Sequence, residues 1–282
     1  MRPRLKSAPM SPQLYALGAI ALWASLASLG VTLRHVPPFL LTGLALVIGR
    51  VPAWPLARQW RVPPRTLALG IYGLFAYHFL LFIALRLAPP VEANLVNYLW
   101  PLLIVLLAPL LLRDVRLKLA HVLAGLAGFT GAAIAILGGG GASGAWSWGY
   151  LPALGAAFIW STYSLWTRRV DSFPTAAVGL FGLVSGLLSL ACHALLEPPV
   201  QLSTRDLALI VLMGLGPLGA AFFLWDKALK TGDARHIGIL SYITPLASTT
   251  LLVLVTDGAF SPSILAAAAL IIGAAVLGTR AR

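Results

Sequence analysis

The sequence has few charged residues and a single cysteine. Only 10% of its 282 residues are Asp, Glu, Lys or Arg, whereas soluble domains carry about 25%. Cys192 has no partner for a disulfide within the chain and cannot form a cysteine metal site, so we expect neither. Hydrophobic residues make up 59% of the chain. Such a composition lacks the polar surface that water requires, and it predicts an all-α integral membrane protein. We expect no metal and no cofactor.

Acidic residues are the scarcest charged type, with eight against 20 Lys and Arg, which gives a net charge of +12. A basic chain can indicate binding to nucleic acid. Here the basic residues stand singly or in small clusters between long apolar runs, which is typical of membrane topology instead. We therefore expect no nucleic-acid partner.

Long apolar runs indicate where the chain crosses the membrane, because a spanning helix needs about 20 mostly apolar residues. The first run is too long for a signal peptide, and we expect it to remain as a span. The runs predict ten spans, at roughly 12–31, 37–55, 66–86, 91–112, 119–138, 147–167, 174–196, 206–228, 236–256 and 261–279.

The basic residues predict the orientation of these spans. Sixteen Lys and Arg fall on the side of the two termini, and three fall on the other side, namely Arg34, Arg86 and Arg205. Arg50 lies within the second span and is not counted. Because positive residues collect on the cytoplasmic side, both termini should be cytoplasmic.

The second half of the sequence echoes the first. LGAIALWAS at 17–25 resembles LGAAFIWST at 154–162, and the stretch 84–102 recurs 144 positions later. The glycine-rich stretch 138–144 separates two halves, 1–140 and 141–282, of five spans each. An odd number of spans inverts the second half relative to the first, which is typical of secondary transporters. The sequence thus predicts two inverted five-helix repeats around a central cavity that opens to each side in turn.

Polar side chains within spans are costly in lipid unless they face protein or a watery cavity. Asn94, Asn97 and Tyr98 fall on one face of the fourth span. Ser241 and Tyr242 take similar places in the ninth span, its repeat partner. We interpret these two faces as the cavity lining; hydrogen bonding between helices without a ligand is the alternative.

A proline occurs at the same place in each of these two spans. Pro101 and Pro245 each remove a backbone hydrogen bond and favour a kink. They are candidate hinges, and a fixed bend without motion is the alternative.

Aromatic side chains supply further candidates for substrate contacts. Tyr77 and His78 lie in the third span, where His78 could contact substrate, carry a proton or serve as a structural donor. Trp160 and Tyr163 lie in the sixth span, and Trp100 lies beside the polar face of the fourth. Aromatic rings with a few amides and hydroxyls suit a neutral or zwitterionic, partly apolar substrate.

The acidic residues all fall in loops or near span ends. With no buried carboxylate for proton coupling, the sequence favours a uniporter, and proton coupling through His78 is the alternative.

These features are similar to a known family. The five-plus-five duplication and the two Trp-containing starts resemble the EamA-type branch of the drug/metabolite transporter superfamily. The segment APPVEANLVNYLWP, residues 88–101, resembles YddG-type aromatic amino acid exporters within it. The resemblance implies an exporter in the bacterial inner membrane. It places substrate contacts on His78, Asn94, Asn97, Tyr98, Trp100, Trp160, Tyr163, Ser241 and Tyr242.

Other functions stay open at this point. A related transporter of nucleosides, amines or drug-like compounds would have the same architecture. A membrane enzyme acting on lipids is disfavoured, because no paired acidic motif, His–Glu metal spacing or nucleophile with an adjacent base is found. A purely structural scaffold would not need matched polar residues. We expect a monomer in lipid whose partner is a small-molecule substrate.

Overall fold

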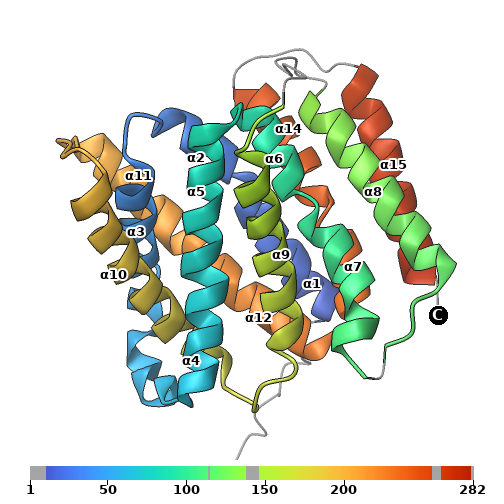
Figure 1. The fold of residues 1–282 in the computed structure, drawn as a ribbon, viewed down its shortest axis with the longest axis horizontal. Helices are drawn as coiled ribbons and strands as arrows, with labels where there is room; N and C mark the ends of the chain where they lie inside the picture. The colour runs from blue at the N-terminus through green and yellow to red at the C-terminus, as the bar shows by residue number, and fades with distance from the viewer. Residues whose placement is uncertain (1–10, 114, 138–145, 256–261, 281–282) are drawn as a thin grey trace, which may run out of the picture.

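The computed structural model describes residues 11–113, 115–137, 146–255 and 262–280, which form helices and short connections without any strand (Figure 1). The glycine-rich stretch 138–144 lies outside these residues. Six stretches are long and apolar enough to cross a membrane: Pro12–Thr32, Pro64–Leu87, Pro90–Leu111, Leu119–Leu137, Thr175–Leu196 and Thr204–Thr231. A seventh candidate is α3 (Pro38–Ile48) with the 3₁₀-helix η1 (Val51–Trp60), which are bent by 70°. The prediction of an all-helical membrane protein is confirmed.

Several of the long stretches contain more than one helical segment. The six stretches comprise α1 (Pro12–Ala24) and α2 (Leu26–Thr32), α4 (Pro64–Ile71) and α5 (Tyr77–Leu87), α6 (Pro90–Asn97) and α7 (Trp100–Leu111), α8 (Leu119–Leu137), η3 (Thr175–Ala177) and α10 (Val178–Leu196), and α11 (Thr204–Leu215) and α12 (Ala221–Thr231). The other predicted spans coincide with α9 (Tyr150–Trp166), with α13 (Ala234–Leu240) and α14 (Ile243–Val255), which are separated by a short interruption, and with α15 (Pro262–Arg280).

The helix starts follow from local sequence. Ser11 precedes α1, and its hydroxyl accepts a hydrogen bond from the Leu14 N–H at 3.3 Å. Ser203 and Asp206 form a reciprocal capping box at the start of α11. Helices α1, α3, α4 and α6 carry proline in the first turn, where its missing N–H costs nothing.

Helix irregularities recur at a spacing of 144 residues. A π-helical turn, η2 (Tyr72–Ala76), joins α4 to α5, and a second one, η4 (Gly216–Ala220), joins α11 to α12. Pro217 lies within η4 and lacks the N–H for a regular helical bond. Interruptions also follow α6 at Tyr98 and α13 at Ser241–Tyr242.

The prolines expected to kink helices from within lie instead just after these interruptions. Pro101 is the second residue of α7, and Pro245 is the third residue of α14. A proline in the first turn of a helix loses no intrahelical bond, so both residues begin a new segment rather than bend a continuous one.

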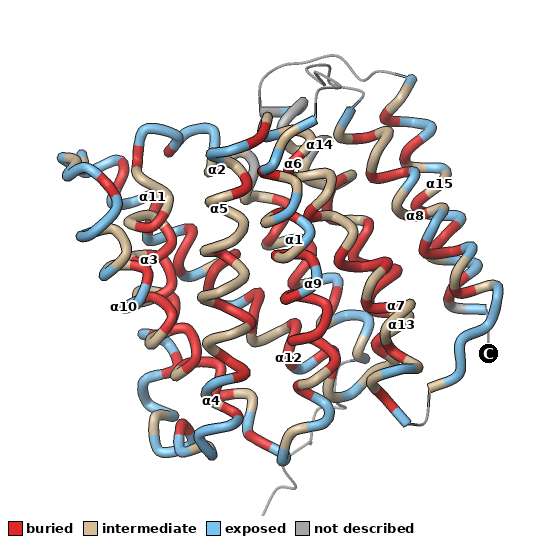
Figure 2. The backbone as a smooth tube through the Cα atoms, viewed as in Figure 1, coloured by how far each residue is buried: buried red, intermediate tan, exposed pale blue. Residues whose placement is uncertain are grey.

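The helices form a bundle whose buried residues lie along its middle (Figure 2). Helices α8 and α15 pack against each other at one edge of the bundle, and α10 and α11 lie at the opposite edge (Figure 1). A Cβ atom at Gly131 of α8 would lie 3.1 Å from the Ala267 carbonyl oxygen of α15. Glycine in α8 therefore permits this close approach, as the sequence predicts.

Helices α3 and α10 also pack closely and are joined at both ends. At one end, the buried Arg50 side chain donates to the carbonyl oxygens of Leu46, Val178 and Leu218, the last two belonging to α10 and η4. A Cβ atom at Gly182 of α10 would overlap the Arg50 guanidinium, so glycine is needed there.

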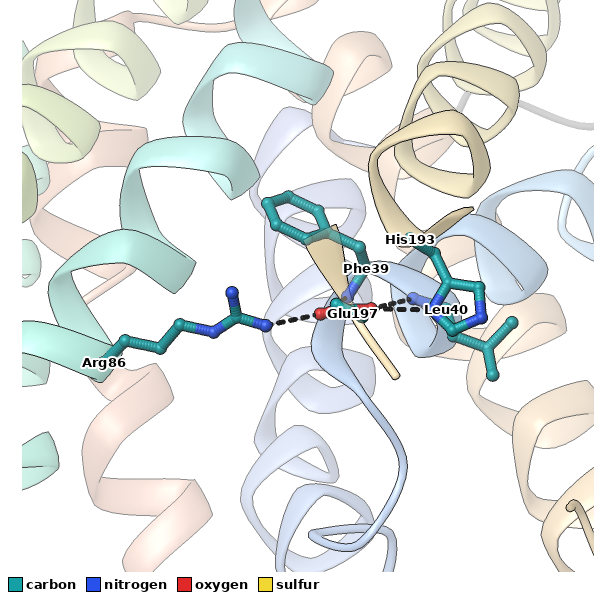
Figure 3. Close-up of polar contacts among 5 residues, drawn as sticks. All are labelled: Phe39, Leu40, Arg86, His193 and Glu197. Atoms are coloured by element: carbon teal, nitrogen blue, oxygen red, sulfur yellow. Dashed lines mark hydrogen bonds and ion pairs between the residues drawn. The ribbon is translucent and has the colours of Figure 1, made fainter. Parts of the chain in front are cut away.

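At the other end of this helix pair, the side chain of Glu197 is fully buried (Figure 3). It accepts hydrogen bonds from the N–H groups of Phe39 at 3.0 Å and Leu40 at 3.1 Å, at the start of α3. Arg86 of α5 lies 2.7 Å from one carboxylate oxygen, and His193 lies 3.0 Å from the other. A carboxylate suits the N-terminus of a helix, and here it ties α10 to α3 and α5.

Candidate functional site

Eight side chains from five helical segments pack together in the interior of the bundle. Trp160 of α9 is central. The centroid of its ring lies 5.3 Å from that of Tyr77, 5.4 Å from that of Tyr163, 5.8 Å from that of Trp23 and 6.3 Å from that of Trp100. Helix α12 adds the rings of Phe222 and Trp225. We call the aromatic cluster Trp23, Tyr77, His78, Trp100, Trp160, Tyr163, Phe222 and Trp225.

The polar atoms of the cluster are bonded so that they fix the rings. The Asn97 amide donates to the Tyr77 hydroxyl at 3.2 Å. Trp225 Nε1 donates to Ser164 Oγ at 3.2 Å. Trp23 Nε1 donates to the carbonyl oxygen of Pro217, in η4, at 3.1 Å. The matched π-helical turns thus contact the site: η4 through Trp23, and η2 through Gly73, against which the Tyr163 ring packs.

Two acceptor positions in the cluster remain for a ligand. His78 Nδ1 lies 2.5 Å from the Leu74 carbonyl oxygen, which can only accept, so this nitrogen carries the proton. In the neutral form of the ring, Nε2 is then an acceptor. Asn97 Oδ1 is buried without a hydrogen-bond partner among the described residues. Flat rings with a few acceptors can hold an aromatic group and its polar substituents.

The structure brings together six of the ten residues that the sequence singles out. Tyr77, His78, Trp100, Trp160 and Tyr163 belong to the aromatic cluster, and Asn97 is bonded to it. Asn94 and Tyr98 are half-buried on the same stretch of chain as Asn97.

Ser241 and Tyr242 lie elsewhere in the bundle. The Ser241 hydroxyl donates to the Gly238 carbonyl oxygen of its own helix at 2.5 Å. Tyr242 is fully buried against Leu102, Ile271 and the backbone of α8 at Gly128. The second half therefore reaches the cluster through α9 and α12 rather than through the segment that matches Tyr98.

Sequence reasoning missed Phe222 and Trp225. Both project from α12, and Trp225 stacks on Trp160 at 6.3 Å. The position 144 residues before Trp225 is Leu81, so the internal repeat gives no signal for this ring. Trp225 also lies near the end of the predicted span 206–228, where tryptophan is typical of the membrane interface, so its position gave no signal either.

The expectation that no carboxylate is buried within the spans is wrong. Asp226, on α12 beside Trp225, is 2% exposed. It accepts hydrogen bonds from Thr175 Oγ1 at 2.6 Å and Lys230 Nζ at 2.7 Å. Glu197 is buried at the other end of the bundle. Because the protein does bury carboxylates, a lack of buried acidic residues is no longer an argument that it is a uniporter.

Two hollows open near the ends of α7 and α9. One, of about 580 Å³, is lined by Leu112, Arg113, Val115, Arg168 and Arg169. The other, of about 370 Å³, is lined by Thr167, Arg168, Val170, Ser172 and Lys230. Arg168 borders both. Their volumes fall within the range of small-molecule sites, and their charged side chains are all basic.

Comparison with protein families identifies the architecture. The EamA-like transporter family model matches residues 10–137 and again 147–280. The chain belongs to the EamA-like transporter family. This membership and the apolar helices make it a membrane transporter and not an enzyme, as the sequence predicts.

Its relatives in this family include curated exporters. The chain is 43% identical over 279 residues to the aromatic amino acid exporter YddG of Ancylobacter novellus, covering 95% of this chain and 97% of that protein. It is 27% identical to the YddG of Salmonella typhimurium, covering 88% and 89%. A crystal structure of a protein 42% identical in sequence matches with a TM-score of 0.89 over 95% of this chain and 96% of that one.

Proposed function

We propose that this protein exports aromatic amino acids across the bacterial inner membrane, and that the aromatic cluster binds the substrate ring. The observation that carries the proposal is the packing of five tryptophan and tyrosine rings around Trp160, with acceptors at His78 and Asn97. An aromatic substrate ring is attracted to the aromatic rings of the protein in edge-to-face or offset arrangements. Such a site therefore favours Trp and Phe over aliphatic amino acids. The name of the 43% identical relative supports the same substrate class.

The proposed architecture has ten spans in two inverted halves, 1–140 and 141–282, with both termini cytoplasmic. Three observations support it. The family model matches the chain twice, the π-helical turns η2 and η4 lie 144 residues apart, and basic residues are concentrated on one predicted side. Loops on the cytoplasmic side of a membrane protein carry an excess of Lys and Arg, so that side is assigned to the cytoplasm.

The proposed mechanism is alternating access between the two halves. The interruptions before Pro101 and Pro245 are candidate hinges, because backbone without regular helical bonds changes direction at low cost. The turns η2 and η4 contact the cluster directly and would pass a change in its packing to α4–α5 and α11–α12. Asn94, Tyr98, Ser241 and Tyr242 stay in the proposal as residues that line the path when these segments move.

The test is flux of labelled Trp, Phe and Leu through the purified protein in liposomes, with and without a pH gradient. We expect saturable flux of Trp and Phe and at least about tenfold lower efficiency for Leu. Competition by unlabelled nucleosides or amines should be weak. Strong competition by those compounds without amino acid flux would move the substrate to the alternative class. Dependence on the gradient would show proton coupling, for which the buried Asp226 and His78 are the groups to substitute.

A further inference from the structure

The hollow of about 370 Å³ beside Lys230 adjoins the aromatic cluster through one ion pair. Lys230 lines the hollow on one side. On its other side, Nζ lies 2.7 Å from Asp226 Oδ2, and Asp226 is the neighbour of Trp225 in the cluster. Lys230 thus connects the hollow to the helical turn of α12 that carries Trp225.

The ammonium of Lys230 is held by two hydrogen bonds and an aromatic ring. Its ammonium has three N–H groups. One donates to Asp226 and a second to the Phe173 carbonyl oxygen at 2.9 Å, and the ammonium also lies 3.5 Å from the centre of the Phe173 ring. These contacts fix the side chain, which is 21% exposed. A fixed ammonium group on a residue that lines a hollow is suited to bind an anion.

The surroundings of the hollow favour an anion as well. Arg168 lines it, and Arg113 and Arg169 line the larger hollow that shares Arg168. No carboxylate of the described residues lies in either lining or forms an ion pair with these three arginines. Positive groups that line a concave surface raise the local concentration of anions.

We propose that this hollow is an entrance site that takes the α-carboxylate of the amino acid from the cytoplasm, held by Lys230 and Arg168. The proposal rests on the proposed function, which supplies the substrate and the orientation. The carboxylate would meet Lys230 in the hollow, and the ring would then pass from this site to Trp225 and Trp160. The hollow is large enough for an amino acid.

The experiment measures labelled Trp uptake from each face, with inside-out vesicles for the cytoplasmic face and right-side-out vesicles for the other. Lys230→Gln and Arg168→Gln are compared with Lys227→Gln, an exposed lysine on the same helix that does not line the hollow. We expect KM at the cytoplasmic face to rise about tenfold in the first two variants and to stay unchanged at the other face. Lys227→Gln should resemble the unsubstituted protein.

Competitors separate charge recognition from a structural effect. Indole-3-propionate has the ring and carboxylate without the ammonium, and tryptamine has the ring and ammonium without the carboxylate. We expect indole-3-propionate to lose about tenfold in potency at the cytoplasmic face of both variants, while tryptamine keeps its potency. Equal losses for both competitors, or equal changes of KM at both faces, would overturn the proposal.

Two controls keep the outcomes distinct. Lys230→Gln leaves Asp226 buried without its cation and can unfold the protein, whereas Arg168 is exposed, so Arg168→Gln decides the matter if Lys230→Gln is not folded. Repeating the assay in liposomes made only of zwitterionic lipid tests whether the bound anion is a lipid headgroup. If the effect of the substitutions appears only with anionic lipid, the proposal is overturned.

The outcomes also separate this proposal from the proposed function. If the unsubstituted protein moves no Trp at all, the proposed function fails. If Arg168→Gln transports Trp normally from both faces, only the entrance site is refuted.

Discussion

The guanidinium of Arg86 lies 2.7 Å from the buried carboxylate of Glu197, which ties the end of α5 to the end of α10 (Figure 3). The same carboxylate accepts the N–H groups that begin α3. Three helical stretches distant in sequence thus meet on one side chain. In the proposed orientation this contact lies on the side opposite the two basic hollows.

Glu197→Gln should lower the stability of the protein. The amide keeps the shape of the carboxylate but loses its charge, and it cannot accept all four of the contacts to α3, Arg86 and His193. We expect a loss of about 2 kcal/mol or more, measured as unfolding in detergent micelles. Asp171→Asn, at an exposed carboxylate, should change stability by less than about 0.5 kcal/mol. Equal effects of the two substitutions on stability would contradict the view that the Glu197 carboxylate holds α3, α5 and α10 together.

Gly73→Ala should damage both stability and flux. A Cβ atom at Gly73, in η2, would overlap the Tyr163 ring of the aromatic cluster. Moving that ring should cost about 1–3 kcal/mol. Gly273→Ala is the matched control, because nothing lies within 4 Å of a Cβ there and alanine is the better helix former by up to about 1 kcal/mol. A stable Gly73→Ala protein with normal Trp flux would contradict the packing of η2 on the cluster.

Asp233 should make the protein less stable in acid. It lies between α12 and α13, where burial acts to raise its pKa, but hydrogen bonds and the charge of Arg235 lower the pKa from 3.8 to about 2. Because the folded pKa lies below the unfolded one, this stabilisation is present above about pH 4 and is lost as the pH falls towards 2. The stability difference between the unsubstituted protein and Asp233→Asn should therefore shrink over that range. A difference that is constant from pH 6 to pH 2 would argue against the Arg235 contact.

Much of the fold follows from composition and spacing. Apolar length alone predicts the six long stretches from Pro12–Thr32 to Thr204–Thr231. The helix interruptions are less visible in sequence, because η2 contains no proline and depends on the packing of Gly73 against Tyr163 of another helix. The ten-span count stays a prediction, since α9, α13 and α14 are shorter than a full span.

The site is predictable only in part. Tyr77, Trp100 and Trp160 stand out as aromatic residues deep in apolar runs, and they meet in the aromatic cluster. Internal repetition matched Tyr242 to Tyr98 and placed both on a cavity lining, whereas the ring of Tyr242 packs on Gly128 of α8, away from the aromatic cluster. Helical periodicity holds only within a continuous helix, and the interruption at Ser241–Tyr242 ends it.

Burial of Asp226 could not be read from its position near a span end. Its partner Thr175 lies 51 residues earlier, at the start of another helical stretch, and the Phe173 carbonyl oxygen beside it accepts from Lys230, the other partner of Asp226. Only the i, i+4 spacing of Asp226 and Lys230 signals a pair in the sequence, and that spacing is equally common on exposed helices.

Saturable Trp flux by Trp160→Ala, compared with Trp146→Ala, tests the central claim most directly. Trp160 is 3% exposed at the centre of the cluster, whereas Trp146 is 70% exposed and outside it. With both variants folded in liposomes, we predict that Trp160→Ala loses at least about 90% of kcat/KM for Trp, a cost of about 1.4 kcal/mol or more. Trp146→Ala should keep its flux. A folded Trp160→Ala protein that transports Trp with unchanged kcat/KM would contradict substrate binding by the aromatic cluster.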